Sequence, residues 1–455
     1  MDARTQQLIS APPLPLLVKM ATPNSIAFFI QAGVSMTEVW FIGQLGTVSL
    51  AAIALVFPLL MLTQMMSGGA MGGAVASSIA RSLGAGNVER AEQLIWHTLV
   101  MAVGGAVLFL TAFLVAGQWF LAFLGGSGET LTEAITYCTI LFSGGIFIWC
   151  MGTMSAVYRG MGNMRFPAML MAISACIQVP LSGTLVLGAF GIPSMGVAGA
   201  AVSAVASAAI ISTLMLGRLA FGTGPIRLRR EQCLLTRELF ADLFRVFGPA
   251  SLSPLMSVAT LVSLTAIVGL FGEHALAGYG IGSRIEFLMV PLVFGLGASM
   301  TSLVGMSIGA ADVRRAEHVG WTGGLSACLL AGVIGLGLAL TPGVWIPLFT
   351  DNEAVFSVAE SYMQIVGPAY AFLGLGLSLY FATQGAGAMR WPVLATFARF
   401  VIAVGGAILL AFHFELGLQG IFYAAAGAML VYGIMIAGAL WLGAWRPHAS
   451  REISR

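Results

Sequence analysis

Four polar residues interrupt an apolar stretch near the N-terminus: Asn24, Gln31, Ser35 and Glu38. At 100° per residue on an α-helix, they fall within an arc of about 60°, which makes a polar stripe on one face. If this helix crosses a membrane, its carboxylate costs about 2.5–3.5 kcal/mol and must face a water-filled cavity or a partner. A carboxyl in such a place can bind and release a proton. We therefore predict that Glu38 is a proton or ion site.

Polar side chains in three further apolar stretches are candidates for lining the same cavity. Gln64 lies in MLTQMMSGGAMGG, and Gln178 and Ser182 lie four residues apart on one helix face. Arg284 and Glu286 occur in GIGSRIEFLMVP, where a spacing of two points them to different sides of a helix. Isolated Gln and Ser also join helices by hydrogen bonds, and an Arg near a helix end also extends toward the membrane surface. Both interpretations stay open here.

The composition indicates an all-α integral membrane protein. The 455 residues are 58% apolar and 8% charged, whereas a soluble domain is about 25% charged. Apolar stretches long enough to cross a membrane as helices recur along the whole chain. Strand-like alternation is absent, which excludes a barrel. Twelve spans are predicted, at about residues 15–41, 49–78, 92–117, 131–157, 166–189, 196–219, 246–271, 278–307, 318–345, 358–386, 393–413 and 420–445.

The basic residues predict the orientation. Almost all Lys and Arg follow even-numbered spans or lie near the termini and the middle loop, whereas the opposite loops, such as GQLGTVS, contain neither. By the positive-inside rule, both termini are cytoplasmic, in a plasma (inner) membrane. Apart from Lys19 and Arg218, which lie at the ends of their spans, only Arg284 and Arg399 lie inside predicted spans, and Arg399 is interpreted as reaching the surface from near a helix end.

Two motifs repeat at one offset. RSLGAGNVERAE at 81–92 matches MSIGAADVRRAE at 306–317, and RGMGNMRFP at 159–167 matches QGAGAMRWP at 384–392. Both pairs are 225 residues apart, which predicts two six-helix halves of the same orientation, as in many secondary transporters. We expect a first bundle at 1–219, a cytoplasmic linker at 220–245, a second bundle at 246–445 and a cytoplasmic tail at 446–455. Glycine turns with a following Arg also have a local purpose, which does not explain the shared offset.

Together these motifs resemble the multidrug and toxic compound extrusion (MATE) family over essentially the whole chain. Further matching stretches are EVWFIGQLGTVSLAA, GVAGAAVSA and ALAGYGIGSRIE. The resemblance implies two six-helix bundles arranged in a V, which export cationic or amphiphilic compounds in exchange for protons or sodium ions. It carries the first-span acidic residue of the family over to Glu38. The family often has Asn-x-x-x-Asp where this chain has Gln178 and Ser182, so the second carboxylate is missing.

The inventory of polar groups favours proton coupling. Sodium prefers several oxygen ligands including carboxylate, and spans seven and ten also lack a central carboxylate. Asn24, Gln31 and Ser35 could still supply neutral oxygens beside Glu38 for sodium. We expect no cofactor, no metal, no catalytic residues and no nucleic-acid partner. The expected partners are small organic substrates and membrane lipids, and the protein is expected to be a monomer.

Three rival functions are considered. One is a non-transporting membrane scaffold, in which the embedded Glu38 would have no evident purpose. A flippase for lipid-linked saccharides shares the broad architecture, but such proteins often have extra spans and a more basic cavity. A membrane enzyme should show clustered His or Asp near one membrane face, whereas the five histidines are dispersed. Proton export of cations by one carboxylate is weak, so a second titrating group is also considered, and Glu286 is the available one.

Overall fold

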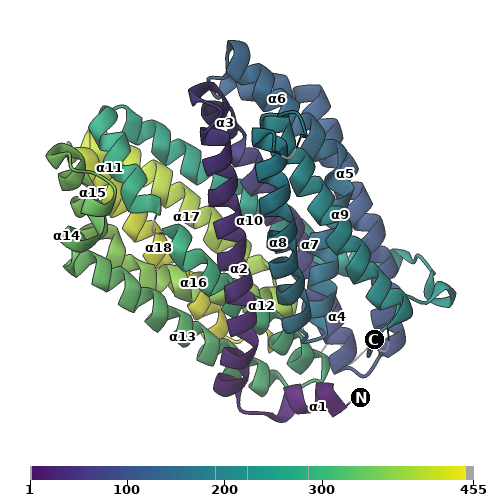
Figure 1. Ribbon diagram of the computed structural model, residues 1–455. Coiled ribbons are helices and arrows are strands. Elements are labelled where there is room, and N and C mark those ends of the chain that lie inside the picture. The colour runs from purple at the N-terminus through teal and green to yellow at the C-terminus, as the bar shows by residue number, and fades with distance from the viewer. Residues whose placement is uncertain (1–2, 190, 223, 285, 447–455) are drawn as a thin grey trace.

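The computed structural model describes residues 3–189, 191–222, 224–284 and 286–446, and these residues form helices and turns without any strand (Figure 1). The first half of the chain contains α1 (Ala3–Ser10), α2 (Pro13–Gly43), α3 (Thr47–Gln64), η1 (Met65–Met71), α4 (Gly72–Gly84), α5 (Val88–Phe123), α6 (Gly128–Ser143), α7 (Gly145–Gly160), α8 (Arg165–Leu187) and α9 (Val197–Phe221). The second half contains η2 (Arg230–Gln232), α10 (Arg237–Gly269), α11 (Glu273–Arg284), α12 (Glu286–Gly309), α13 (Val313–Leu340), α14 (Pro342–Trp345), η3 (Ile346–Leu348), α15 (Glu353–Val366), η4 (Gly367–Ala369), α16 (Tyr370–Ala386), α17 (Arg390–Ile408), η5 (Leu409–His413) and α18 (Gly417–Trp441).

The helices confirm the predicted membrane crossings. Within the described residues, eleven helical segments are long and apolar enough to cross a membrane. The pair α6 and α7, bent by 56°, supplies a twelfth crossing. The second crossing, 47–84, contains the π-helical turn η1, which widens the helix and leaves backbone carbonyls free to accept other donors.

The segment predicted as a linker, 220–245, contains the start of a helix. Helix α10 begins at Arg237, because the Thr236 side chain accepts a hydrogen bond from the Leu239 amide and caps the helix there. The part of the linker before α10 is attached to α5: the buried Glu92 carboxylate accepts a hydrogen bond from the Arg227 amide at 3.0 Å and lies 3.5 Å from Arg229 Nε.

The short helix α1 was not predicted. The guanidinium of Arg315 donates to the Leu8 and Ala11 carbonyls at 3.0 and 2.6 Å, which satisfies orphan carbonyls at the end of the helix. The N-terminal segment is thereby joined to α13 of the second half.

Helix packing repeats from one half to the other. In the first half, α7 packs against α4, α5 and α9, and α8 packs against α2 and α9. In the second half, α16 packs in the same way against α12, α13 and α18, and α17 against α10 and α18. Each second-half helix is the sequence equivalent of its first-half counterpart. The two halves are therefore pseudo-symmetric, as the repeated motifs predicted.

The repeated motif builds the same turn twice. Gly86 and its equivalent Ala311 both have positive φ, at 77° and 61°. The next residues, Asn87 and Asp312, cap α5 and α13 by accepting from backbone amides three residues later, each at 2.9 Å. The motif therefore forms a turn and a helix cap locally, in addition to marking the duplication.

The same motif brings the two halves into backbone contact. A Cβ added to Gly84 would collide with the Met306 carbonyl, and one added to Gly309 would collide with the Arg81 carbonyl. These four residues are two equivalent pairs at the offset of 225. Helices α4 and α12 therefore cross so closely that only glycine fits at the crossing.

Large aromatic side chains fill the interior of each half. Trp149 is fully buried and packs against Phe109, with ring centroids 5.2 Å apart. Gly105 provides the space for this indole, because an added Cβ would collide with the ring, whereas its neighbour Gly104 faces open space. Packing of this kind fixes the positions of the helices that carry the polar groups.

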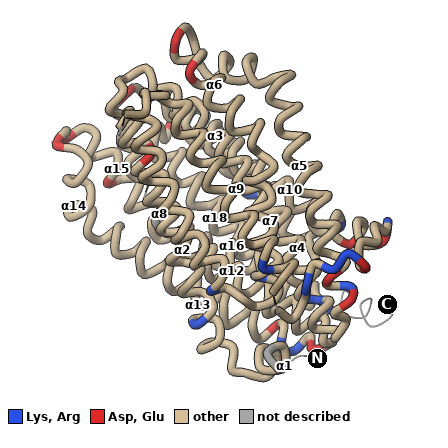
Figure 2. Tube along the Cα trace, turned by 45° about the vertical axis from the view of Figure 1, so that its right-hand side comes forward, with Lys and Arg blue, Asp and Glu red and all other residues tan. Residues whose placement is uncertain are grey.

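Lys and Arg gather at one end of the bundle, which also holds both ends of the described chain (Figure 2; Figure 1). We call it the basic end and define it by Arg81, Arg90, Arg165, Arg315 and Arg446. The charge distribution agrees with the predicted one-sided arrangement.

Candidate functional site

Glu38 lies near the end of α2 that is remote from the basic end. Its side chain is half-buried, and Gln178 of α8 donates from Nε2 to Glu38 Oε1 at 2.9 Å. The two residues are 140 positions apart and meet because α2 and α8 pack along each other. The structure thus joins two of the predicted site residues.

The other neighbours of the carboxylate are neutral. Ser203 of α9 lies near Glu38 and donates its hydroxyl to the Ala200 carbonyl at 2.8 Å, and Tyr137 of α6 also lies near Glu38. In the part of the chain that the structure describes, no basic side chain forms an ion pair with Glu38. A carboxylate held by neutral groups keeps its charge available for a proton or for a cationic ligand.

Ser182 lies one helical turn beyond Gln178. It is fully buried, and its Oγ has no hydrogen-bond partner among the described residues. Nearby, Gly183 lies against the ring of Phe41, so this part of α8 faces α2. A buried hydroxyl without a partner, one turn from the residue that binds Glu38, is an oxygen that a bound cation could use.

The polar stripe on α2 does not gather into one site. Asn24 is buried and directs Nδ2 to Met164 Sδ at 3.6 Å, about 21 Å along the helix from Glu38 at 1.5 Å per residue. Gln31 is half-buried and Ser35 is exposed. A shared helix face therefore places these residues in line without bringing them together.

The remaining candidates lie elsewhere. Gln64 is exposed at the last residue of α3, directly before η1. Arg284 is exposed and is the last described residue of α11, within the eighth crossing at Glu273–Gly309. Glu286 begins α12, and its side chain lies outside the described residues. Arg399, expected to reach the surface, instead lies in mid-helix with its guanidinium 5.4 Å from the Tyr432 ring centroid.

Sequence reasoning missed Tyr137 and Ser203. Both lie in apolar stretches, and Ser203 occurs within GVAGAAVSA, so a polar residue in a stretch that resembles the family was the available signal. The sequence could not show that α6 and α9 present them to Glu38.

The second half has no equivalent site. At the offset of 225, Glu38 corresponds to Ser263, and Gln178 and Ser182 correspond to Ala403 and Ala407. The two halves pack alike, but the first half contains a carboxylate at this position and the second half contains only small, neutral side chains.

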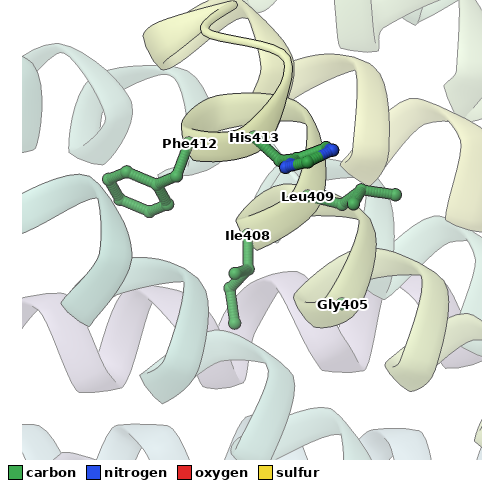
Figure 3. A pocket seen from close by; sticks show the side chains of 5 residues that line it. All are labelled: Gly405, Ile408, Leu409, Phe412 and His413. Carbon is green, nitrogen blue, oxygen red and sulfur yellow. The ribbon is translucent and has the colours of Figure 1, made fainter.

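A hollow of about 520 Å³ lies at the C-terminal end of α17 and on η5 (Figure 3). It is lined by Gly405, Ile408, Leu409, Phe412 and His413. Because one short segment supplies the whole lining, with His413 as its polar group, the hollow is separate from the Glu38 site.

Apolar helical crossings in two repeated halves define a multi-pass membrane protein with the internal repeat that is typical of transporters. The MatE family model matches the chain twice, over residues 23–184 and 249–409, which follows the internal repeat. The chain belongs to this family, the multidrug and toxic compound extrusion transporters. The resemblance inferred from the sequence is thereby confirmed.

Known relatives and solved structures agree with this family. A multidrug resistance protein NorM of Burkholderia vietnamiensis is 26% identical over 441 residues, which cover 94% of this chain and 92% of the relative. An FAD transporter of Shewanella oneidensis is 24% identical over 389 residues, with 83% and 82% covered. The outward-facing structure of a multidrug resistance MATE family transporter superposes with a TM-score of 0.88, at 23% identity and full coverage of both chains. This last likeness shows the shared fold.

Proposed function

We propose that this protein is a proton-coupled antiporter that exports cationic or amphiphilic organic compounds, with Glu38 as the coupling carboxylate. The observation that carries the proposal is the surroundings of Glu38, which is hydrogen-bonded to Gln178 and has no basic partner among the described residues. A permanently ion-paired carboxylate could not exchange ligands in this way. The proposal treats residues 1–219 and 246–445 as the two units that move against each other.

The proton and the substrate compete for Glu38 in this mechanism. While the site is open to the outside, Glu38 takes up a proton, loses its negative charge and holds a cationic substrate less strongly. After the substrate leaves, the protein turns to the inside, where the proton is released and the anionic site is restored. Gln178 keeps the carboxylate oriented toward the ligand in both steps.

Sodium coupling is the second candidate. The buried, unpartnered Oγ of Ser182 favours it, since Na⁺ needs several oxygen ligands. Against it, the family's second carboxylate is replaced by that serine, so only Glu38 supplies charge. A proton requires one titratable group, which the site provides.

Transport into liposomes tests the proposal. Ethidium-type dye movement is measured with purified protein, driven either by an imposed pH gradient or by a sodium gradient. We expect pH-driven transport without sodium, its loss in Glu38→Gln and its retention in Glu129→Gln, which changes an exposed carboxyl on α6 of the same half. Transport that persists in Glu38→Gln would show that this carboxylate is structural, and transport that needs sodium would favour the second candidate.

The proposed orientation has both termini and the basic end in the cytoplasm of an inner-membrane, monomeric transporter. Cys233 is exposed in the linker and can be labelled by a membrane-impermeant maleimide. We expect labelling in inverted vesicles and little in right-side-out vesicles, with Cys233→Ser as the control. The reverse pattern would invert the topology.

A further inference from the structure

The two halves come into close backbone contact at the basic end. There α4 of the first half packs against α10, α12 and α16 of the second. Gly84 and Gly309 each lie against the backbone of the opposite half, so no side chain separates the two helices. Backbone contact of this kind is lost as soon as the helices move apart by a small distance, because dispersion attraction falls steeply with separation.

A buried ionic network spans the same junction. Arg81 of α4 lies 3.2 Å from Asp242 of α10, and Arg90 of α5 lies 3.3 Å from the other carboxylate oxygen. The Arg81 and Asp242 side chains are only 4% and 3% exposed. The Arg81 guanidinium also donates to the Gly385 carbonyl of α16 at 3.3 Å. One side chain of the first half thus joins two helices of the second.

Neighbouring groups hold the network in position. Arg81 donates to the hydroxyls of Ser77 and Ser78, which lie one turn earlier on its own helix. Arg245, one turn beyond Asp242, adds a third positive charge close to that carboxylate. Burial of Arg81 and Asp242 is tolerated because their opposite charges pair and both side chains form further hydrogen bonds.

Water can reach this network when the halves separate. A cavity of about 50 Å³, enough for one or two water molecules, borders Ser78, Arg81, Ser82, Ala85, Asn87, Arg90 and Asp242. The Arg90 side chain is 17% exposed at the edge of the network. Separation would therefore rehydrate the charges instead of leaving them in an apolar interior, which suits a contact that breaks in each cycle.

A deeper contact lies between the network and the centre of the bundle. Gln384 of α16 donates to the Gly69 and Ala70 carbonyls of η1 at 3.4 and 3.3 Å, and Gly73 leaves space for its amide. Its sequence equivalent Arg159 donates to the Gly68 carbonyl in the same turn, at 3.4 Å. The π-helical turn thus binds equivalent residues from both halves.

We propose that these contacts form the gate that closes the basic end of the transport pathway, with the Arg81–Asp242–Arg90 network as its polar part. Glu38 lies toward the opposite end of α2, so the gate separates the coupling site from the basic end. The gate rests on the proposed alternating access but not on the identity of the coupling ion. Opening toward the basic end requires the glycine contacts, the network and the Gln384 contact to separate together.

Distance measurements between spin labels test the gate. The five native cysteines are replaced, and labels are placed at Val88 and Arg314, exposed or partly exposed residues in the first turns of α5 and α13. Pulsed electron paramagnetic resonance in lipid nanodiscs then gives the populations of short and long distances. We expect Asp242→Asn to raise the ratio of long to short distances at least tenfold, with Asp242→Glu restoring most of the short population.

Two further variants separate gate opening from unfolding. Gly84→Ala should also raise the long-distance population, because its methyl group would collide with the opposite half. Glu317→Gln breaks the exposed Glu317–Arg446 pair, which lies within the second half, and should leave the distances unchanged. Each variant must elute as a single species in size-exclusion chromatography to be counted.

The outcomes distinguish the gate from the proposed function. Unchanged distances in folded Asp242→Asn and Gly84→Ala would overturn the gate, even if dye transport is proton-coupled. Distances that lengthen as expected, in a protein without pH-driven transport, would support the gate and refute the proton antiport.

Discussion

A membrane potential applied across liposomes tests how many charges the protein moves in each cycle. With Glu38 as the single coupling carboxylate, one proton enters for each substrate molecule that leaves. The equivalent positions in the second half, Ser263, Ala403 and Ala407, have no titratable carboxyl. Export of a monovalent cation is then electroneutral, and we expect its equilibrium distribution to ignore the potential.

The expected magnitudes follow from the driving forces. One pH unit corresponds to about 1.36 kcal/mol, or about tenfold accumulation. A potential of 100 mV contributes about 2.3 kcal/mol per net charge moved, which is zero for a monovalent cation exchanged against one proton. For a neutral substrate both terms add to about 3.7 kcal/mol, or roughly 500-fold. The same protein should therefore respond to the potential with neutral substrates and not with monovalent cations.

The assay fixes the pH gradient and sets the potential with potassium and valinomycin. The dye gradient at which net flux stops is measured at several potentials for a monovalent cation and for a neutral substrate. A stopping gradient for the cation that changes about tenfold for each 59 mV would refute the single-proton reasoning, because it requires one net charge per cycle. In that case Glu286→Gln is the next variant, and loss of the potential dependence would identify Glu286 as the second proton carrier.

Three further predictions concern the site, the core and the linker. Gln178→Leu removes a hydrogen bond to a charged group, which is worth about 1.5–3 kcal/mol. We therefore expect initial dye efflux to slow about tenfold or more. An unchanged rate would show that this amide does not position the carboxylate. Gly105→Ala should lower the free energy of unfolding by about 1–3 kcal/mol and lower the Tm in detergent, because the added methyl group collides with a buried indole. Gly104→Ala should leave the Tm unchanged. Equal Tm values for the two variants would contradict the packing argument. Glu92→Gln should speed tryptic cleavage of the linker several-fold by weakening its attachment to α5. The control Glu129→Gln, which changes an exposed carboxyl on α6, should have little effect, and equal cleavage rates in the two variants would show that Glu92 does not hold the linker.

Part of the gap between prediction and structure comes from the limits of periodicity. The spacing of Asn24 and Glu38 correctly placed both on α2, yet one contacts Met164 and the other Gln178. The helical period determines which residues lie on the same face of a helix. It does not show which neighbouring helix packs against that face at each position along the helix. The same limit explains why Arg399 was expected at the surface and lies against an aromatic ring.

The positive-inside rule concealed a second role of one basic residue. Arg81 was interpreted only as a marker of orientation, and Asp242 was assigned to the linker. The structure brings them together across 161 residues and buries both. An arginine that only marks the cytoplasmic side and an arginine that forms a buried ion pair look alike in the sequence, since both lie next to a membrane helix.

Sequence alone determined the helical membrane crossings, the duplication at an offset of 225 and the choice of Glu38 as the predicted coupling residue. Each of these depends on local apolarity, on chain length or on self-similarity, which are properties of residues read in order. Tertiary structure alone decided that Gln178, Ser203 and Tyr137 surround the carboxylate and that glycines of the repeat close one end of the bundle. These contacts join residues far apart in the chain, and they arise from the packing of whole helices. In a membrane each helix forms its own backbone hydrogen bonds, so its neighbours are determined by how well the side chains fit together.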